Sequence, residues 1–385
     1  MTTGLDLDAV LDRLAPEIAE GAAEADATDA FAAANYEALR RERVFSAQVP
    51  ADLGGGGCAH AAMADFLRRL AHACPSTALA LSMHQHLVAA AVLNHRAGRP
   101  GKALLERVAR DEAVLVSTGA NDWLESNGRA EPVEGGWRVS AVKPFASGSP
   151  MGDVMVTSAV EEDGPDGPRV LHFPVPLDAE GVTIGDDWRA MGMRATGSNT
   201  VTLDRVFVPE GALALARPRG PFHPAFAVIL TVALPLIMAA YLGTAEAAAR
   251  IAVERARRRG DDPVTAMTVG RMETALTTAR LALEDMVRRG ADPGFTPDAE
   301  AAAAALTRKA IAAEAVRETV ETALEATGGA GFFRATGLER LLRDIHGAGF
   351  HPLPAGRQQL FCGRLALGLA PVAAPAEGPA ARHAA

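Results

Sequence analysis

The stretch RAEPVEGGWRVSAVKPF, Arg129–Phe145, contains two β-rich runs around a Glu-Gly-Gly turn at residues 134–136. Similar short runs lie on both sides of it, from LVSTG at residues 115–119 to NTVTLDRVFVP at residues 199–209, separated by Gly, Pro and Asp. Short runs of β-branched and aromatic residues between such turn residues are typical of strands. The sequence therefore predicts a compact β domain at residues 113–210.

Helical patterns flank this domain. In residues 1–112 apolar residues recur three and four positions apart, as in Leu79, Met83 and Leu87. After a Pro-rich linker at residues 211–222, Ala- and Leu-rich helical patterns continue through residues 223–370. The tail at residues 371–385 has no periodicity and is predicted to be mobile. We expect an α+β fold that is mostly α, with parts in the order helical, β, helical.

Composition excludes several classes of protein. The chain has 385 residues and a net charge of −9, and no Lys/Arg run is interleaved with aromatics, so nucleic acid is not an expected partner. Three cysteines, Cys58, Cys74 and Cys362, lack the C-x-x-C spacing of a zinc site and do not form a disulfide framework. The acidic, amphipathic N-terminus does not resemble a signal peptide, so we expect a cytoplasmic protein.

The segment Phe226–Ala245 has no charged residue and is long enough to span a bilayer. Pro235 lies in its middle, and the helical pattern continues into EAAARIAVERARRR without a polar break. A helix that is apolar all round is also found fully buried in large helical domains. We expect a buried core helix here and no membrane partner.

Two histidine pairs raise the question of a metal site. His84 and His86 are two positions apart and point about 200° apart on a helix, so they cannot share a metal ion. Both are expected to be structural or solvent-facing, although one of them could face a cleft. His346 and His351 are five positions apart, again poor spacing for shared ligation unless the two glycines between them break the helix. We predict no metal and treat these histidines as separate residues.

The run KPFASGSP, residues 143–150, allows two interpretations. It is either a strand followed by a Ser-Gly turn or a shelf for a planar ring, with Phe145 alongside the ring and the Ser147 hydroxyl at its edge. No G-x-G-x-x-G follows a strand, and neither G-x-S-x-G nor H-E-x-x-H occurs. A Rossmann cofactor site, an elbow-type serine hydrolase and a zincin are therefore disfavoured.

Three strings together resemble the acyl-CoA dehydrogenase superfamily of flavoproteins. MGMRATGSNTVTLDRVFVP (residues 191–209) resembles its mid-chain signature, and GGWRVSAVKPFASGSPMGDVMVTSA (residues 135–159) resembles its G-x-K-x-F/W-I-T strand. ATGGAGFFRATGLERLLRD (residues 326–344) resembles its Gly-Gly segment followed by an E-R-x-x-R-D helix. The resemblance implies an N-terminal helical domain, a middle β-barrel or sandwich, and a C-terminal four-helix bundle, assembled as a homotetramer or homodimer.

The resemblance also implies a flavin site. It assigns flavin contacts to two strand segments and to a Gly-Gly loop that approaches the nucleotide end of the flavin in a neighbouring subunit. The strand positions are Val116, Ser117, Thr118, Gly119, Phe145, Ala146 and Ser147, and the loop positions are Gly328 and Gly329. Within this assignment the Ser147 hydroxyl faces flavin N5. The rest of the cavity, which would hold the substrate, is expected to be lined partly by His84, His86, Trp123 and Phe350.

The chain departs from the dehydrogenases of this family. The position of their usual catalytic glutamate falls on Pro352, and the alternative position falls near Leu234 and Pro235, where there is no acid. RARRRGDDP replaces the Arg-x-Gln-Phe-Gly stretch that grips the FAD pyrophosphate, and Glu325 replaces a glutamine. On this interpretation no base is available to remove the α-proton of an acyl thioester.

A flavin monooxygenase branch of the superfamily resembles the chain at Arg343, Asp344 and His351, and at Ser147 and Gly148. These enzymes use reduced flavin, often FMN, from a separate reductase, and oxygenate a small substrate through a C4a-hydroperoxyflavin. The resemblance implies FAD or FMN as cofactor, His351 as base or substrate orienter, and Ser147 as hydrogen-bond partner of N5. Two alternatives stay open: an acyl-CoA dehydrogenase with a relocated base, and a scaffold without catalytic activity.

Overall fold

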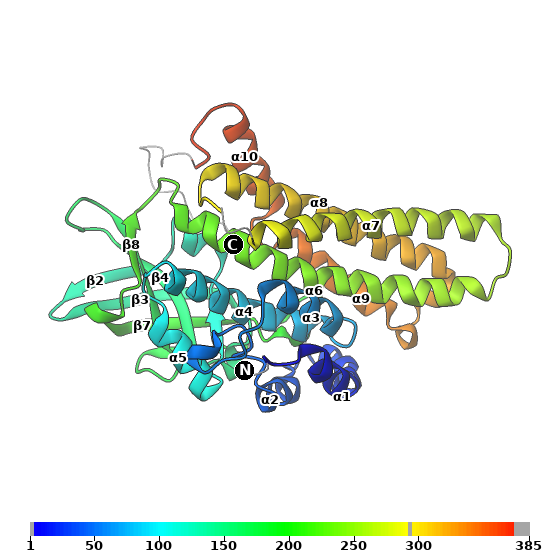
Figure 1. Ribbon diagram of the computed structural model, residues 1–385, viewed down its shortest axis with the longest axis horizontal. Coiled ribbons are helices and arrows are strands. Elements are labelled where there is room, and N and C mark those ends of the chain that lie inside the picture. The colour runs from blue at the N-terminus through cyan, green and yellow to red at the C-terminus, as the bar shows by residue number, and fades with distance from the viewer. Residues whose placement is uncertain (1–3, 292–294, 373–385) are drawn as a thin grey trace.

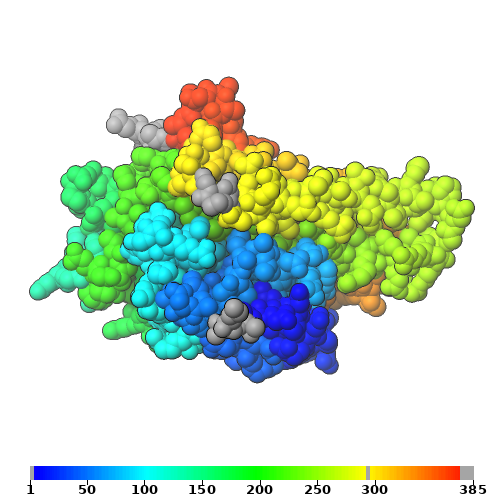
Figure 2. Space-filling model, viewed as in Figure 1, coloured from blue at the N-terminus to red at the C-terminus, as the bar shows by residue number. Residues whose placement is uncertain are grey.

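A computed structural model describes residues 4–291 and 295–372 of the chain. Figure 1 shows a sheet at one end of the molecule and long C-terminal helices that extend away from it. The N-terminal helices lie against both, and Figure 2 shows them on the face turned to the viewer. This is the order of helical, β and helical parts that the sequence predicts. The predicted tail lies, from residue 373 on, outside the described residues.

The N-terminal part consists of five α-helices. Asp6 begins the first of them, because its carboxylate accepts hydrogen bonds from the backbone N–H groups of Asp8 and Ala9. Pro75 occupies the first turn of the fourth, where the missing N–H costs nothing. The helices are α1 (Leu7–Thr28), α2 (Ala33–Arg41), α3 (His60–Leu70), α4 (Pro75–Arg96) and α5 (Lys102–Asp111).

The middle part is one mixed sheet of eight strands in the order β6-β7-β3-β2-β4-β5-β8, with β1 parallel to β4. The two longest strands, β3 and β7, alternate in burial, and one face of the sheet packs on a core containing Trp137, Val139 and Phe173. The strands are β1 (Leu115–Ser117), β2 (Arg129–Val133), β3 (Gly136–Ala146), β4 (Val154–Glu161), β5 (Arg169–Pro176), β6 (Val182–Ile184), β7 (Asn199–Pro209) and β8 (Leu215–Pro218).

The last strand corrects the predicted linker. β8 lies inside residues 211–222 and pairs with β5 in antiparallel register, Leu215 opposite His172 and Pro218 opposite Arg169. The proline at its end made the segment look like a linker in the sequence, but proline is tolerated in an edge strand. The buried side chain of Arg217 further fixes this strand in the β domain.

The apolar segment Phe226–Ala245 is part of α6 (Pro224–Arg257), the first helix of the C-terminal part. In the described residues α4 and α6 are both long and apolar enough to cross a bilayer, but 89% of the apolar window of each is buried inside the fold. The predicted core helix is therefore confirmed. Close packing explains Gly243, where a Cβ atom would lie 1.8 Å from the Arg68 carbonyl oxygen of α3.

Two further long helices, α7 (Pro263–Gly290) and α8 (Ala299–Thr327), complete the body of the C-terminal part. Instead of a fourth long helix there are two short ones, α9 (Leu338–Ile345) and α10 (Ala355–Ala366). The 3₁₀ turn His346–Gly349 and residues 350–354 connect them. This connection carries His351, so the interruption of the fourth helix is what brings that residue out of regular structure.

Adjacent residues in α9 fasten the three parts together. Arg343 forms a two-pronged ion pair with Asp26 of α1, at 3.0 and 2.6 Å, and donates to the Met191 carbonyl oxygen at 3.1 Å. The buried Asp344 carboxylate accepts from the backbone N–H of Met193. Gly192 permits this approach, because a Cβ atom there would lie 2.3 Å from the Arg343 carbonyl oxygen.

His84 of α4 also connects the N-terminal helices to the β domain. Its Nε2 donates to the Phe45 carbonyl oxygen at 2.8 Å, and its Nδ1 accepts from the Leu115 N–H of β1 at 2.9 Å. Burial lowers the pKa values of His84 and His86 to about 4 and that of His172 to about 3. All three histidines are therefore neutral in the folded protein at pH 6.

We predict that stability falls as the pH drops below 6.5. The folded pKa values lie below 6.5, the ordinary value, so unfolding takes up protons and acid favours the unfolded chain. Each histidine contributes up to about 1.4 kcal/mol per pH unit until its folded pKa is reached. Melting temperatures measured from pH 7.5 to 5 should fall, and His84→Gln, which keeps a donor and an acceptor, should reduce the slope. A melting temperature that stays constant to pH 5 would contradict this.

Candidate active site

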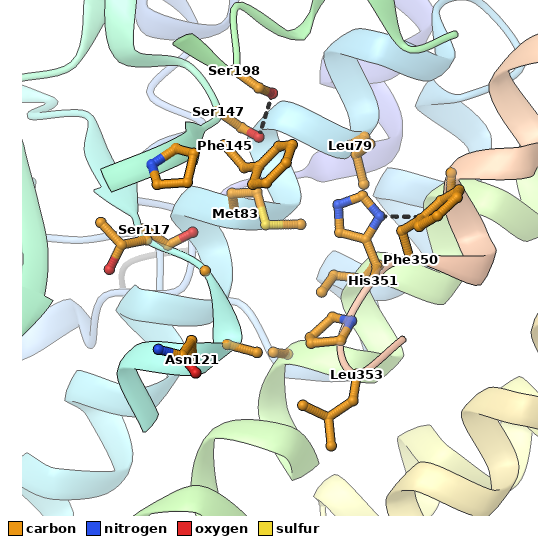
Figure 3. A pocket seen from close by; sticks show the side chains of 18 of the residues that line it. Leu79, Met83, Ser117, Asn121, Phe145, Ser147, Ser198, Phe350, His351 and Leu353 are labelled. Carbon is orange, nitrogen blue, oxygen red and sulfur yellow. Dashed lines mark hydrogen bonds between the residues drawn. The ribbon is translucent and has the colours of Figure 1, made fainter. Parts of the chain in front are cut away.

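A cavity of about 640 Å³ lies where the three parts of the chain meet. The β domain supplies one wall through residues 117–123, β3 and residues 188–198. Helices α4 and α6 and the segment at residues 343–357 supply the others. In Figure 3, Ser117, Phe145 and Ser147 come from the strand side, whereas Phe350, His351 and Leu353 come from the segment after α9. The cavity thus needs all three parts.

Phe145 holds an unusual backbone position on the strand wall. Its φ angle is +63°, and it lies where the pairing of β3 with β7 shifts between Lys143 and Ala146. The ring is 65% exposed and meets Trp188 edge-on, with 6.1 Å between the ring centroids. A bulge that turns an aromatic residue out of the core at a strained φ is typical of binding sites.

Beside Phe145, a file of hydroxyl groups runs along the cavity wall to the Met193 carbonyl oxygen. Ser147 Oγ lies 2.8 Å from Ser198 Oγ, which lies 2.6 Å from Thr196 Oγ1. Thr196 Oγ1 donates to the Met193 carbonyl oxygen at 2.9 Å. Since a carbonyl oxygen only accepts, the proton of each hydroxyl is directed inward: Thr196 to Met193, Ser198 to Thr196, and Ser147 to Ser198. Ser147 then offers lone pairs, not a proton, to the cavity.

A buried ion pair closes the wall behind residues 117–123. Lys143 Nζ donates to Asp122 Oδ1 at 2.7 Å and to the Asn127 carbonyl oxygen at 3.2 Å. The other oxygen of Asp122 accepts from Thr157 Oγ1 at 3.0 Å and from Thr118 Oγ1. Burial lowers the pKa of Lys143, and Asp122 opposes that shift. The network fixes the loop that presents Ser117, Thr118 and Gly119 to the cavity.

His351 lies on the opposite wall. Its Nδ1 is 2.8 Å from the Tyr241 hydroxyl oxygen and 3.1 Å from the Gly347 carbonyl oxygen. Burial lowers the pKa of His351 to about 4 and raises that of Tyr241 well above its ordinary value. Both groups are therefore neutral between pH 5 and 9. Gly347 makes room for the pair, because a Cβ atom there would lie 2.4 Å from the Tyr241 oxygen.

The structure brings most of the predicted residues together. Nine of them line the cavity: Ser117, Thr118, Gly119, Phe145, Ser147, His86, Trp123, Phe350 and His351. Val116 and Ala146 do not, because the alternation of the strands turns their side chains into the core of the β domain. His84 does not line it either, contrary to the prediction, because both of its ring nitrogens bind backbone groups elsewhere. His346 is separate from His351, and its Nδ1 contacts the Leu342 carbonyl oxygen at the end of α9.

Gly328 and Gly329 lie outside the cavity, at the end of α8. Arg259, between α6 and α7, donates there to the carbonyl oxygens of Ala326 and Thr327, at 2.9 and 2.6 Å. Its guanidinium occupies the space in front of Gly328, where a Cβ atom would lie 2.6 Å from Arg259 Nη2. Glu325, in place of the family glutamine, pairs with Arg271. Within one chain the Gly-Gly loop is remote from the cavity.

Among the described residues, Asp122 is the only carboxylate that lines the cavity, and Lys143 and two hydroxyls occupy its oxygens. Pro352, at the position of the missing glutamate, lines the cavity beside His351. No group of three or more metal-ligating side chains occurs in residues 4–291 and 295–372. The cavity wall described here therefore has no free carboxylate to act as a base.

Several residues of the site were missed in the sequence. Tyr241 lies within an apolar segment that predicts only a core helix, and its position beside His351 depends on the fold. Asp122 and Lys143 are 21 positions apart, and only the fold brings their side chains together. One signal was available: Thr196 and Ser198 lie within the mid-chain signature, so polar residues just before a strand could have been suspected of facing the cavity.

Sequence models of the acyl-CoA dehydrogenase N-terminal, middle and C-terminal domains match residues 7–112, 120–206 and 236–353. The amino sugar nitrososynthase RubN8 of Streptomyces rubradiris is 33% identical over 68% of this chain and 64% of its own. The probable FMNH2-dependent monooxygenase SfnC of Pseudomonas putida is 28% identical over 62% of this chain and 59% of its own. The match thus spans less than two thirds of either relative.

Other relatives match over a larger share. The putative acyl-CoA dehydrogenase YdbM of Bacillus subtilis is 28% identical over 89% of this chain and 91% of its own. The solved structure of KijD3 in complex with FMN and an amino-keto deoxysugar nucleotide has a TM-score of 0.85 at 28% identity, covering 96% of this chain and 97% of KijD3. From the three matched domains and this shared architecture, the chain belongs to the acyl-CoA dehydrogenase superfamily.

Proposed function

We propose that the protein is a flavin-dependent monooxygenase that uses reduced FMN from a separate reductase to oxygenate a small organic molecule. One observation carries the proposal: a strand wall with an exposed aromatic ring and hydroxyls faces a neutral histidine across a cavity without a free carboxylate. The names of two relatives, a probable FMNH2-dependent monooxygenase and an FMN complex, support it. A cytoplasmic location and a homo-oligomer remain expectations.

The strand wall fits a flavin ring system. Phe145 offers an apolar face, while Ser117, Asn121 and Asn127 place polar groups around the wall below it. A planar heterocycle with polar edges requires this combination of a flat apolar contact and a few placed hydrogen-bonding groups. The cavity volume of about 640 Å³ lies within the usual range for cofactor and ligand sites. Ser117, Thr118, Gly119, Phe145 and Ser147 would hold the ring.

FMN is favoured over FAD by the end of α8. A dinucleotide needs a site for its second phosphate and adenosine, which the family resemblance places at Gly328 and Gly329. Here the Arg259 guanidinium occupies the space in front of Gly328 and its donors are bound to the carbonyl oxygens of Ala326 and Thr327. Room and hydrogen-bonding capacity for a nucleotide are both reduced at this loop.

His351 acts as a hydrogen-bond donor toward the cavity. His351 Nδ1 has two neighbours, the Tyr241 hydroxyl at 2.8 Å, which can donate to it, and the Gly347 carbonyl oxygen at 3.1 Å, which can only accept from it. We assign Tyr241 as the donor, because its hydroxyl keeps its proton, is the nearer group and has no other hydrogen-bond partner among the described residues. The single proton of the neutral imidazole then resides on Nε2, so His351 presents an N–H and not a lone pair. Bound reduced flavin supplies the electrons that activate oxygen. The His351 Nε2–H orients the substrate or stabilises negative charge that develops during oxygen transfer.

Ser147 offers a hydrogen-bond acceptor to the cavity, whereas His351 offers a donor. The inward-directed protons of Ser147, Ser198 and Thr196 leave an acceptor at the cavity, which suits a ligand that brings an N–H to this edge. Reduced flavin carries a proton on N5, and oxidised flavin does not. Accommodating an acceptor would require Ser147 to turn its proton away from Ser198 and so give up one hydrogen bond of the file, at a cost of about 1 kcal/mol. The file of hydroxyls therefore favours the reduced cofactor.

An acyl-CoA dehydrogenase is the second candidate, because YdbM matches most of the chain. It requires a base close to the substrate α-carbon, and His351 offers a donor while Asp122 is fully paired. The scaffold without catalytic activity requires that the cavity bind no flavin. Both alternatives lead to measurable outcomes.

The first prediction concerns the redox preference of the site. The wild-type protein should bind reduced FMN more tightly than oxidised FMN, and Ser198→Ala should lower that ratio about fivefold, since Ser147 then turns its proton to the cavity. The midpoint potential of bound FMN should fall by about 20 mV in the variant. Ser149→Ala is the matched control, because Ser149 is equally buried but donates to the Gly197 carbonyl oxygen. An equal effect of both variants would refute the role of the hydroxyl file.

The second prediction concerns the Tyr241–His351 pair. Tyr241→Phe frees Nδ1 to donate to the Gly347 carbonyl oxygen, so the proton should move from Nε2 to Nδ1, as measured by nitrogen NMR of labelled histidine. Turnover should fall roughly tenfold or more, since the donor is lost. Tyr36→Phe, at the only other tyrosine of the chain, is the control and should change neither.

The same pair sets the pH dependence of turnover. Because the pKa of His351 is about 4, its contribution should be constant from pH 5.5 to 8 and should be lost only when acid protonates the ring. A His351-dependent inflection near pH 6.5 would show that the ring is exposed to water and acts as an ordinary base.

The third prediction tests the function itself. With a flavin reductase, NADH and FMN, the protein should incorporate one atom of ¹⁸O₂ into members of a panel of small thioethers, heteroaromatics and amines, as detected by mass spectrometry. FAD should serve no better than FMN. Bleaching of bound oxidised flavin by an acyl-CoA without reductase would instead identify a dehydrogenase, and failure to bind either flavin would identify the scaffold.

A further inference from the structure

The cavity has two chemically different halves. The β-domain wall is rich in hydroxyl and amide groups, whereas the opposite half is built from α4, α6 and the segment after α9. On α6 one stripe of residues at helical spacing faces the cavity: Phe226, Ile229, Leu230, Ala233, Ile237 and Tyr241. From Phe226 to Ile237 the stripe is apolar for about 16 Å. Only its last member, Tyr241, is polar, and its hydroxyl is bound to His351.

The remaining sides of this half are also apolar. Leu79 and Met83 of α4 also line the cavity, as do Phe350 and Leu353 of the segment after α9. His86 contributes a neutral ring, because burial lowers its pKa to about 4. We call the space between these residues and the α6 stripe the apolar compartment. Its polar groups are the His351–Tyr241 pair at one end and the His86 ring, whose Nδ1 donates to the Ser82 carbonyl oxygen.

The charges around the whole cavity are already compensated, except at its mouth. Asp122 and Lys143 pair with each other, and Arg343 is held by Asp26 and Glu339. Arg357 is exposed at the start of α10 and has one weak contact, with Asn121 at 3.5 Å. An ammonium group in the compartment would find no free carboxylate among the described lining residues, and a diphosphate would find one arginine, Arg357, that is not already in an ion pair. Desolvating a charge without a partner is strongly unfavourable.

From this division we propose that the apolar compartment takes an uncharged, largely apolar molecule with one hydrogen-bond-accepting heteroatom. The accepting atom would lie toward His351, whose Nε2–H is the donor at that end. The substrate class would then differ from ammonium compounds and from nucleoside diphosphate conjugates. The proposal rests on the proposed function for the position of the flavin, because the β-domain wall must be reserved for the cofactor.

Three probes with the same phenyl ring test the charge preference. Thioanisole is uncharged, benzylamine is a cation and benzoate is an anion at pH 7. Binding to the full-length, FMN-loaded protein is measured by calorimetry. Thioanisole should bind at least about tenfold more tightly than benzylamine. Benzylamine binding as tightly as thioanisole would overturn the proposal, as would tighter binding of benzoate or of a nucleoside diphosphate.

Two matched variants of α6 locate the binding. Ala233→Phe fills the middle of the stripe and should weaken thioanisole binding at least about tenfold while FMN affinity stays the same. Ala225→Phe adds the same ring at a partly exposed position on the same helix outside the cavity and should change neither. Thermal melts verify that both variants fold, and Ala233→Val provides a smaller step if Ala233→Phe does not. Unchanged thioanisole binding in folded Ala233 variants would overturn the proposal.

These outcomes distinguish a failure of the proposed function from a failure of the proposed substrate class. If FMN binds and ¹⁸O is incorporated, but into cationic amines in preference to neutral molecules, the proposed function stands and the substrate class is wrong. If the neutral probe binds in the compartment but FMN does not bind at the β-domain wall, the proposed function fails although the compartment is real.

Discussion

The cavity depends on one junction, the contact of Arg343 and Asp344 with the other two parts of the chain. Arg343 reaches Asp26 in α1 and the Met191 carbonyl oxygen, while Asp344 binds the Met193 backbone. Burial raises the pKa of Asp344 to about 6, because a charged carboxylate is costly away from water. Two neighbouring residues thus fix the β domain, the N-terminal helices and the His351 segment relative to one another. Without this junction the two halves of the site would not face each other.

Local signals in the sequence were sufficient for most of the fold. Turn residues and β-branched runs indicated the β domain that contains β1 to β7, and the uninterrupted apolar segment identified α6 as a core helix. β8 was missed because the prolines in and after it, Pro218 and Pro221, are typical of a linker, and only pairing with β5 makes it a strand. An element is predicted reliably from sequence when its own residues determine its structure. It is predicted poorly when its structure depends on pairing with a segment far away in the chain.

The site was less predictable for the same reason. Resemblance led to Phe145, Ser147 and His351, but the side-chain direction of His84 and the partnership of Tyr241 with His351 arise from packing between distant helices. A histidine in a helix rich in Ala and Leu is equally compatible with a cleft and with a structural bridge. The direction of protons along Ser147, Ser198 and Thr196 also requires coordinates, because it depends on a carbonyl oxygen at the inner end.

The separation of the cavity into a polar wall on the β domain and an apolar wall on α4 and α6 has an evolutionary consequence. Residues that would hold the cofactor and residues that would select the substrate come from different parts of the chain. Substitutions along the α6 stripe can therefore alter specificity while the redox machinery stays intact. A fold arranged in this way could acquire new substrates through a few changes on two helices.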